Sequence, residues 1–223
     1  LKKRARVAVR VTPGVKAGGH AHIATGSADT KFGVEPRQAL ELCRASRRSR
    51  FLTLVGLQCH VGSQILSTAP YRAALGALLG LARALDGEGA PLETLDLGGG
   101  MGIGYDGGPG FDPAALAAAL APGLRGRRER LILEPGRWLV GPAGTLLTRV
   151  LRLKSTSRRR FVVVDAGMND LLRPALYQAR HRVACAAPRP GRAEKVDVVG
   201  PVCETADYLA RGVRLAPTEP GDL

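Results

Sequence analysis

Aromatic side chains, methionine and long apolar runs are all scarce in this chain of 223 residues. Aromatic residues make up 4% of it, and it contains one Trp and two Met. No apolar stretch approaches the roughly twenty residues that a membrane-spanning helix needs. The few aromatic rings offer no visible stacking surface for single-stranded nucleic acid. These scarcities argue against an integral membrane protein and against a single-strand-binding module.

Acidic residues are also few, because 19 Asp and Glu stand against 33 Lys and Arg, which gives a net charge of +14. Such an excess is one mark of nucleic-acid-binding proteins. Here, however, the arginines are spread along the chain, and their clusters at 44–50, 125–130 and 158–160 fall at expected helix ends and turns. We interpret each cluster as solvated surface and expect no specific nucleic-acid partner. Salt-dependent binding of a duplex or single strand would support the alternative.

Cysteine is sparse and widely spaced, at Cys43, Cys59, Cys185 and Cys203. No CxxC pair or neighbouring histidine cluster is present, so we predict no metal site. Reduced thiols fit a cytoplasmic protein best. The first residues form no secretory signal, because Arg10 interrupts a short apolar run, and the chain starts without Met. We therefore expect the natural N-terminus to lie upstream of Leu1.

The first two thirds of the chain alternate strand-like and helical patterns. The strand-like runs are 5–11, 51–59, 92–97 and 130–133, and the helical patterns begin at Pro36, near Pro70 and at Asp112-Pro113. Such alternation predicts βα units with a parallel sheet. A (β/α)8 barrel takes about 250 residues. We therefore predict that residues 1–144 form half of such a barrel, about its last four βα units; an open sheet is the alternative.

After Pro142 the pattern changes to short β-rich runs separated by turns. These runs are 145–153, 160–165, 181–184 and 195–199, with Gly and Pro clustered at 188–191. We predict a second, mostly β domain over residues 145–223. The fold class is thus α/β, a partial barrel followed by a β domain.

Residues suited to chemistry follow three of the expected parallel strands. His60 and Ser63 follow the second strand, Gly98, Gly99 and Gly100 the third, and 134–137 the fourth. Strand ends carry the functional groups of parallel barrels. Successive glycine N–H groups suit a phosphate. Each motif alone has an ordinary interpretation, namely a packed histidine, a plain turn or a structural ion pair. Together they predict a site for an anionic cofactor with an acid and an arginine beside it.

The β-rich part contributes two further motifs, at 165–177 and 200–204. Cys203 stands next to Glu204 after a Gly-Pro turn. This position fits a partly exposed reactive thiol or a small buried residue, and composition does not separate the two.

The combination of these motifs resembles the diaminopimelate decarboxylase family, in the alanine-racemase-like, fold-type III group of pyridoxal 5'-phosphate (PLP) enzymes. The matching stretches occur in the family's order and span nearly the whole chain: 11–15, Thr25-Gly26, 31–33, 59–64, 98–100, 134–137, 165–177 and 200–204.

The resemblance implies roles for the cofactor residues. His60 stacks on the pyridine ring of PLP, and Glu134 pairs with the ring nitrogen, which makes the ring an electron sink. The implied cofactor-binding set is His60, Ser63, Gly98, Gly99, Gly100, Glu134, Gly136 and Arg137.

The resemblance also implies substrate residues and a homodimer. Arg137, Arg173 and Tyr177 grip carboxylates, a task that bidentate arginine suits. Glu204 meets the distal ammonium, and Cys203 is the proton donor or a close helper, both acting across the dimer interface. The implied reaction is decarboxylation of meso-2,6-diaminopimelate to L-lysine and CO2, a lyase step of lysine biosynthesis.

Two other functions remain open at this point. One is a decarboxylase of the same fold that acts on ornithine, arginine or carboxynorspermidine; Arg173 with Tyr177 favours a dicarboxylate instead. The other is a non-catalytic homologue. The family's cofactor-bearing lysine lies on the first barrel strand, in a context that none of the lysines here shares, and its C-terminal tyrosine has no counterpart. We therefore expect a fragment that is inactive alone.

Overall fold

The computed structural model describes residues 3–15, 31–105 and 107–223, which form two compact units. We call residues 1–104 and 109–143 the barrel unit, and residues 105–108 and 144–223 the β unit. The matching motif at Thr25-Gly26 lies outside the described residues. No helix within the described ranges is long and apolar enough to cross a membrane.

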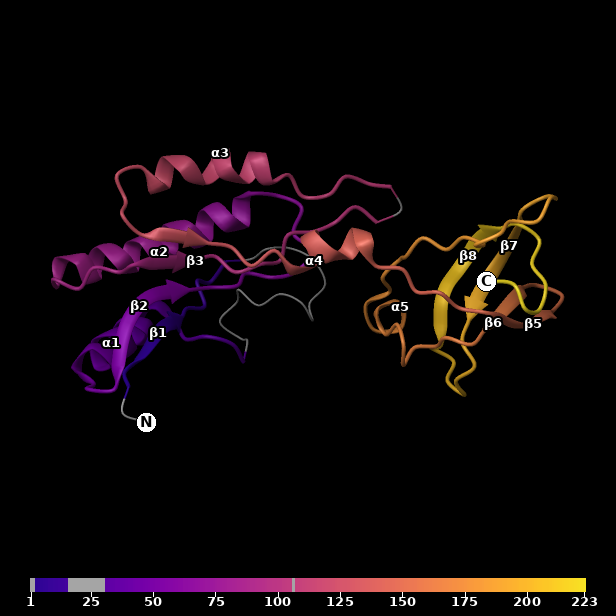
Figure 1. Ribbon diagram of the computed structural model, residues 1–223, viewed down its shortest axis with the longest axis horizontal. Coiled ribbons are helices and arrows are strands. Elements are labelled where there is room, and N and C mark those ends of the chain that lie inside the picture. Colours follow the sequence, from indigo (N-terminus) through magenta and orange to yellow (C-terminus); the bar gives the residue numbers. More distant parts are fainter. Residues whose placement is uncertain (1–2, 16–30, 106) are drawn as a thin grey trace. The chain divides into compact units, whose positions relative to one another are not determined.

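The barrel unit consists of four parallel strands in the order β1-β2-β3-β4, with helices between them (Figure 1). The strands are β1 (Ala5–Arg10), β2 (Leu52–Gln58), β3 (Thr94–Asp96) and β4 (Arg130–Ile132). The helices are α1 (Pro36–Arg48), α2 (Ala69–Gly87), α3 (Pro113–Leu124) and α4 (Gly136–Val140), followed by a 3-10 turn, η2 (Gly141–Ala143). The predicted βα alternation is confirmed.

Local sequence explains where the helices begin. Pro36 and Pro113 occupy first-turn positions, where a missing N–H costs nothing. Asp112 caps α3 by accepting hydrogen bonds from the N–H groups of Ala114 (2.8 Å) and Ala115 (3.2 Å). α2 packs on β2 and on both neighbouring helices. Its buried residues, which include Leu78 and Leu85, join the core of the barrel unit.

The register of the sheet brings three strand ends to one edge. Gln58 on β2 pairs with Asp96 on β3, and Asp96 pairs with Ile132 on β4. Each of these residues is the last of its strand. The loops that follow β2, β3 and β4 therefore start side by side.

The β unit has a four-stranded sheet in the order β5-β6-β7-β8, with one short helix. Its elements are β5 (Val150–Ser155), β6 (Arg160–Val164), α5 (Arg173–Tyr177), β7 (Glu194–Val199) and β8 (Tyr208–Leu215). β6 and β7 are parallel, and the outer pairs are antiparallel.

Two predictions for this part were wrong in detail, and one strand was not predicted. Residues 181–184 form no strand; Val183 packs against the buried cluster of the sheet, but this stretch has no strand partner in the described structure. β5 starts at Val150 rather than at residue 145. β8 was not predicted, because Arg211 and Gly212, with φ +63°, interrupt its apolar pattern.

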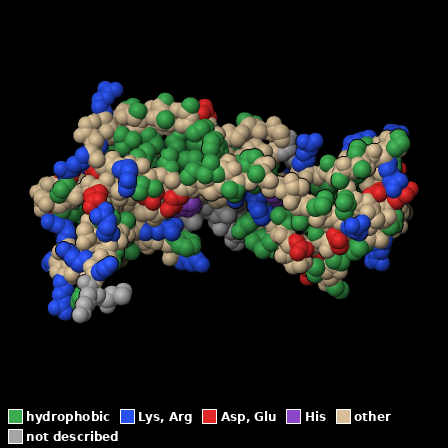
Figure 2. All heavy atoms as spheres, in the orientation of Figure 1, with side chains coloured by type: hydrophobic (Ala, Val, Ile, Leu, Met, Phe, Trp, Pro, Cys, Tyr) green, Lys and Arg blue, Asp and Glu red, His purple; other side chains and the backbone are tan. Residues whose placement is uncertain are grey.

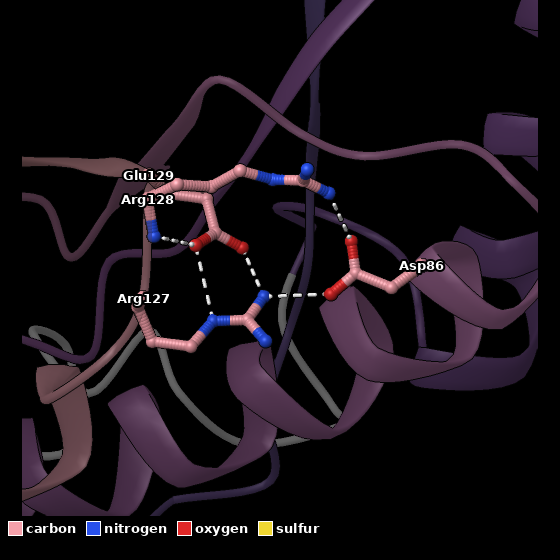
Figure 3. Close-up of polar contacts among 4 residues, drawn as sticks. All are labelled: Asp86, Arg127, Arg128 and Glu129. Carbon is pink, nitrogen blue, oxygen red and sulfur yellow. Dashed lines mark hydrogen bonds and ion pairs between the residues drawn. The ribbon is translucent and has the colours of Figure 1, made fainter.

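The basic side chains are scattered among acidic, polar and apolar ones on the face that Figure 2 shows. The interpretation of the 125–130 cluster as solvated was wrong for Arg127. Its side chain is 18% exposed and pairs with Asp86 and Glu129 (Figure 3). Sequence could not reveal the pairing of Arg127 with Asp86, because Asp86 lies on α2, about forty residues away.

Candidate active site

The loops after β2, β3 and β4 interlock through backbone and side-chain hydrogen bonds. The Gly99 N–H donates to Nδ1 of His60 (3.1 Å), which joins the third loop to the second. The Glu134 N–H donates to the Gly98 carbonyl (2.9 Å), which joins the fourth loop to the third. The three motifs that sequence singled out separately thus form one cluster.

The glycine run is packed so closely that side chains are excluded. Gly98 and Gly100 have φ of +68° and +96°, a region that L side chains rarely adopt. A Cβ on Gly98 would lie 2.5 Å from the Cys59 carbonyl oxygen, and one on Gly99 would overlap the Glu134 carbonyl. The amides of Gly98 and Gly99 already donate to Asp96 (2.8 Å) and His60 (3.1 Å). A phosphate that accepted the Gly98 and Gly99 N–H groups would share these donors with Asp96 and His60 or take the place of these two acceptors.

His60 is half-buried and held in one orientation. Because Nδ1 accepts the Gly99 N–H, that nitrogen is unprotonated and the ring is neutral. Burial lowers the pKa of His60, and the positive charge of Arg10 adds to the effect. The site therefore presents a flat, uncharged imidazole.

Asp96, which sequence reasoning missed, stands beside Glu134. Its carboxyl group accepts the Gly98 N–H (2.8 Å). Burial raises the pKa of Asp96, and the negative charge of Glu134 raises it further. The only sequence signal was its place immediately before the glycine run. Glu134 itself is an exposed residue.

Arg137 pairs with a neutral group. Its Nη1 donates to Oε1 of Gln64 (2.9 Å), one residue after Ser63 in the second loop. Across the described ranges no carboxylate forms an ion pair with Arg137. The alternative of a structural Glu134–Arg137 ion pair therefore does not hold in this structure. Gly136, beside Arg137, donates its N–H to the Glu134 carbonyl (2.8 Å).

The remaining predicted residues belong to the β unit. Arg173 and Tyr177 are the first and last residues of α5. Nη1 of Arg173 donates to the Tyr105 hydroxyl (2.8 Å) and lies 3.2 Å from Nε2 of His181. Sequence reasoning gave no role to Tyr105 or His181.

Cys203 and Glu204 lie in the turn between β7 and β8. Both are exposed and line a cleft of about 690 Å³ within the β unit. The thiol is thus accessible, which removes the alternative of a small buried residue. Buried Asp207 shapes the turn by accepting the N–H groups of Val202 (2.9 Å) and Met168 (2.6 Å).

Comparison with known proteins now identifies the family. The sequence family described as "Pyridoxal-dependent decarboxylase, pyridoxal binding domain" matches residues 1–141. The chain belongs to the pyridoxal-dependent decarboxylases. The resemblance inferred from the motifs is confirmed, as is the fold class of a partial barrel followed by a β domain.

Relatives of this decarboxylase chain cover it almost completely. It is 45% identical over 223 residues to diaminopimelate decarboxylase of Neisseria meningitidis serogroup A, covering all of this chain and 55% of that protein. The crystal structure of diaminopimelate decarboxylase from Helicobacter pylori complexed with L-lysine has a TM-score of 0.92 at 38% identity, over 99% of this chain and 55% of that one.

A lysine decarboxylase from Selenomonas ruminantium is more distant, with a TM-score of 0.81 at 28% identity over 99% of this chain and 56% of that one. A crystal structure of this enzyme, abbreviated SrLDC, has also been solved in complex with PLP and cadaverine. The chain spans about half the length of the relatives that it matches.

Proposed function

We propose that this chain is part of a diaminopimelate decarboxylase, which binds PLP and converts meso-2,6-diaminopimelate to L-lysine and CO2. The observation that carries the proposal is the interlocked cluster of strand-end loops, with His60, Glu134 and Arg137 around one glycine run. The names of the relatives support the substrate. An ornithine-type decarboxylase and a non-catalytic homologue are the competing functions.

The residues of the cluster fit PLP. They include a flat neutral imidazole, an exposed carboxylate, and three successive glycines at which a Cβ would clash with neighbouring backbone. When bound, PLP supplies a protonated pyridine ring that accepts the electron pair released as CO2 leaves. In this proposal Glu134 holds the proton at the ring nitrogen and His60 stacks on the ring. Ser63, Gly98, Gly99, Gly100, Gly136 and Arg137 complete the cofactor set.

The substrate residues are cationic or hydroxylic where carboxylates must bind. Arg137, Arg173 and Tyr177 bind the two carboxylates of the substrate, and Glu204 binds its distal ammonium. Cys203 delivers the proton that takes the place of CO2 on carbon. We further propose a cytoplasmic homodimer in which Cys203 and Glu204 act in the other protomer's site. The accessible thiol of Cys203 supports its role.

Substrate choice tests the proposal most directly. The complete gene product that contains this chain, loaded with PLP, is assayed for CO2 release from meso-2,6-diaminopimelate, L-ornithine and L-lysine. We expect the highest kcat/KM for diaminopimelate, because only this substrate offers a second carboxylate. Preference for ornithine would support the competing decarboxylase, and no turnover of any substrate would support a non-catalytic homologue.

Substitution of Glu134 tests the proposed electron sink. Glu134→Gln keeps the size of the side chain but removes its negative charge. We expect kcat to fall by about 10²-fold or more, the scale of a positioned acid or base, with little change in KM. A rise in KM at unchanged kcat would instead show that Glu134 only helps to bind the substrate.

A further inference from the structure

Gln64 adopts a backbone conformation that glutamine normally avoids. Its φ is +58°, and Gln178 is the only other non-glycine residue with positive φ in the described part of the chain. Such a conformation is strained for a residue with a long side chain and persists only where the surroundings impose it. Gln178 merely ends α5, whereas Gln64 lies inside the loop after β2.

The surroundings of Gln64 account for its conformation. Its side-chain amide binds the backbone of Ile103 twice, since Nε2 donates to the Ile103 carbonyl (2.6 Å) and Oε1 accepts the Ile103 N–H (3.3 Å). The next residue, Ile65, donates to the Gly100 carbonyl and accepts from the Gly102 N–H, both at 2.9 Å. Four hydrogen bonds thus fasten residues 64–65 to residues 100–103.

The same amide also holds Arg137. Oε1 of Gln64 accepts from Nη1 of Arg137 (2.9 Å), which uses the second lone pair of that oxygen. A neutral acceptor fixes the direction of a guanidinium without cancelling its charge. A carboxylate in the same place would pair with Arg137 and compete with an anionic ligand.

We propose that Gln64 is a positioning residue that orients Arg137 toward a substrate carboxylate while leaving its charge uncompensated. The strained loop, fastened to the segment after the glycine run, holds the amide in place. The site thereby selects amino acids that offer Arg137 a carboxylate other than the one that leaves as CO2. The substrate part of this inference rests on the proposed function; the positioning of Arg137 does not.

Two substitutions of Gln64 separate the effect of charge from the effect of reach in the complete PLP-loaded gene product, and a third substitution serves as the control. Gln64→Glu keeps the shape but adds a charge. Gln64→Asn tolerates positive φ yet is one methylene too short. The control is Gln38→Ala, at an exposed position on α1.

Binding of pimelate, a dicarboxylate without amino groups, is measured by calorimetry. Modification of Arg137 by phenylglyoxal is followed by peptide mass spectrometry, and retention of PLP by absorbance.

We expect Gln64→Glu to weaken pimelate binding and raise KM by about tenfold, because its carboxylate occupies Arg137. It should also slow the modification of Arg137. Gln64→Asn should speed the modification severalfold, because the guanidinium is released. Both variants should retain PLP, and the control should match the wild type in every measurement.

Unchanged modification rates in both Gln64 variants would overturn the proposal, as would unchanged pimelate binding by Gln64→Glu in an enzyme whose wild type binds pimelate. If the wild type neither binds pimelate nor decarboxylates diaminopimelate, the proposed function fails by itself. The modification rates of Arg137 then still decide whether Gln64 positions it.

Discussion

Asp96 places a half-buried carboxyl group where a neutral amide would cost less free energy of folding. Burial and the neighbouring Glu134 both raise its pKa from the ordinary value of 3.8. An ionised Asp96 is therefore less stable in the folded chain than in the unfolded one. Groups retained at such a cost mark functional sites. The carboxyl also fixes the glycine turn through the Gly98 N–H.

Replacement of Asp96 by asparagine should stabilise the protein at neutral pH. The amide keeps an acceptor for the Gly98 N–H and loses the charge beside Glu134. We expect Asp96→Asn to raise Tm at pH 7 by about 2 °C. The gain should disappear below pH 3.8, where Asp96 is protonated in both states, and should grow as the pH rises from there through its raised folded pKa.

A suitable control is Asp165→Asn, because Asp165 has the opposite shift. Hydrogen bonds from the Thr148 hydroxyl (2.6 Å) and the Arg149 N–H (2.8 Å) lower the pKa of Asp165. Its ionised form therefore stabilises the fold above pH 3.8, and the substitution should lower Tm at pH 7. If both variants shifted Tm in the same direction, the electrostatic explanation would be wrong.

Among the elements, α2 and β4 are joined by a network of four charged residues (Figure 3). Arg127 donates to Asp86, in the last turn of α2 (2.9 Å), and to Glu129, just before β4 (3.0 Å from Nε). Arg128 also reaches Asp86 (3.0 Å). The network lies at the entrance to β4, opposite the end that carries Glu134. In parallel barrels this side serves stability.

Loss of Arg127 should destabilise the fold strongly. The Glu129 side chain is 0% exposed, so Arg127→Ala leaves a buried carboxylate without its guanidinium. Urea denaturation should show a loss of about 3 kcal/mol. Burial alone would raise the pKa of Glu129, but hydrogen bonds from Arg127 lower it. The wild type should therefore lose this stability as the pH falls through the lowered pKa of Glu129.

Arg128→Ala is the matched control for this network. The Arg128 side chain is 63% exposed, and exposed ion pairs contribute little. We expect a loss of at most about 0.5 kcal/mol. Equal losses in the two variants would mean that burial of Glu129 does not determine the strength of the network.

At the scale of the whole molecule, the proposed chemistry is divided between two units. The barrel unit holds His60, Glu134 and Arg137, and the β unit holds Cys203 and Glu204. Each unit has its own hydrophobic core. In the proposed homodimer, Cys203 and Glu204 of one protomer act in the site of the other.

Mixed dimers would reveal such shared sites. Complete gene products carrying Glu134→Ala or Cys203→Ala should each be nearly inactive. When the two are unfolded together and refolded, a hybrid dimer regains one native site, so activity should recover to about a quarter of the wild type. Separately refolded samples are the control. If mixing restores no activity, both residues act within one protomer or the protein is no dimer.

Sequence alone determined the order of βα units, the starts of α1 and α3, and the motifs at three strand ends. These features depend on local rules, namely apolar periodicity, first-turn prolines, an N-cap and glycine turns. It also carried enough specific motifs to identify the family. It failed in the β unit, where residues 181–184 form no strand and β8 was missed, and it was wrong for Arg127, which is not solvated surface.

Tertiary structure decided the contacts between residues far apart in the chain. Asp96 meets Glu134, Gln64 meets Arg137, and Arg127 meets Asp86, across separations of about forty to seventy residues. No local pattern encodes such pairs, because they follow from strand register and from close backbone packing at the glycine run. Charge, burial and proton affinity at the site therefore became readable only from the folded chain.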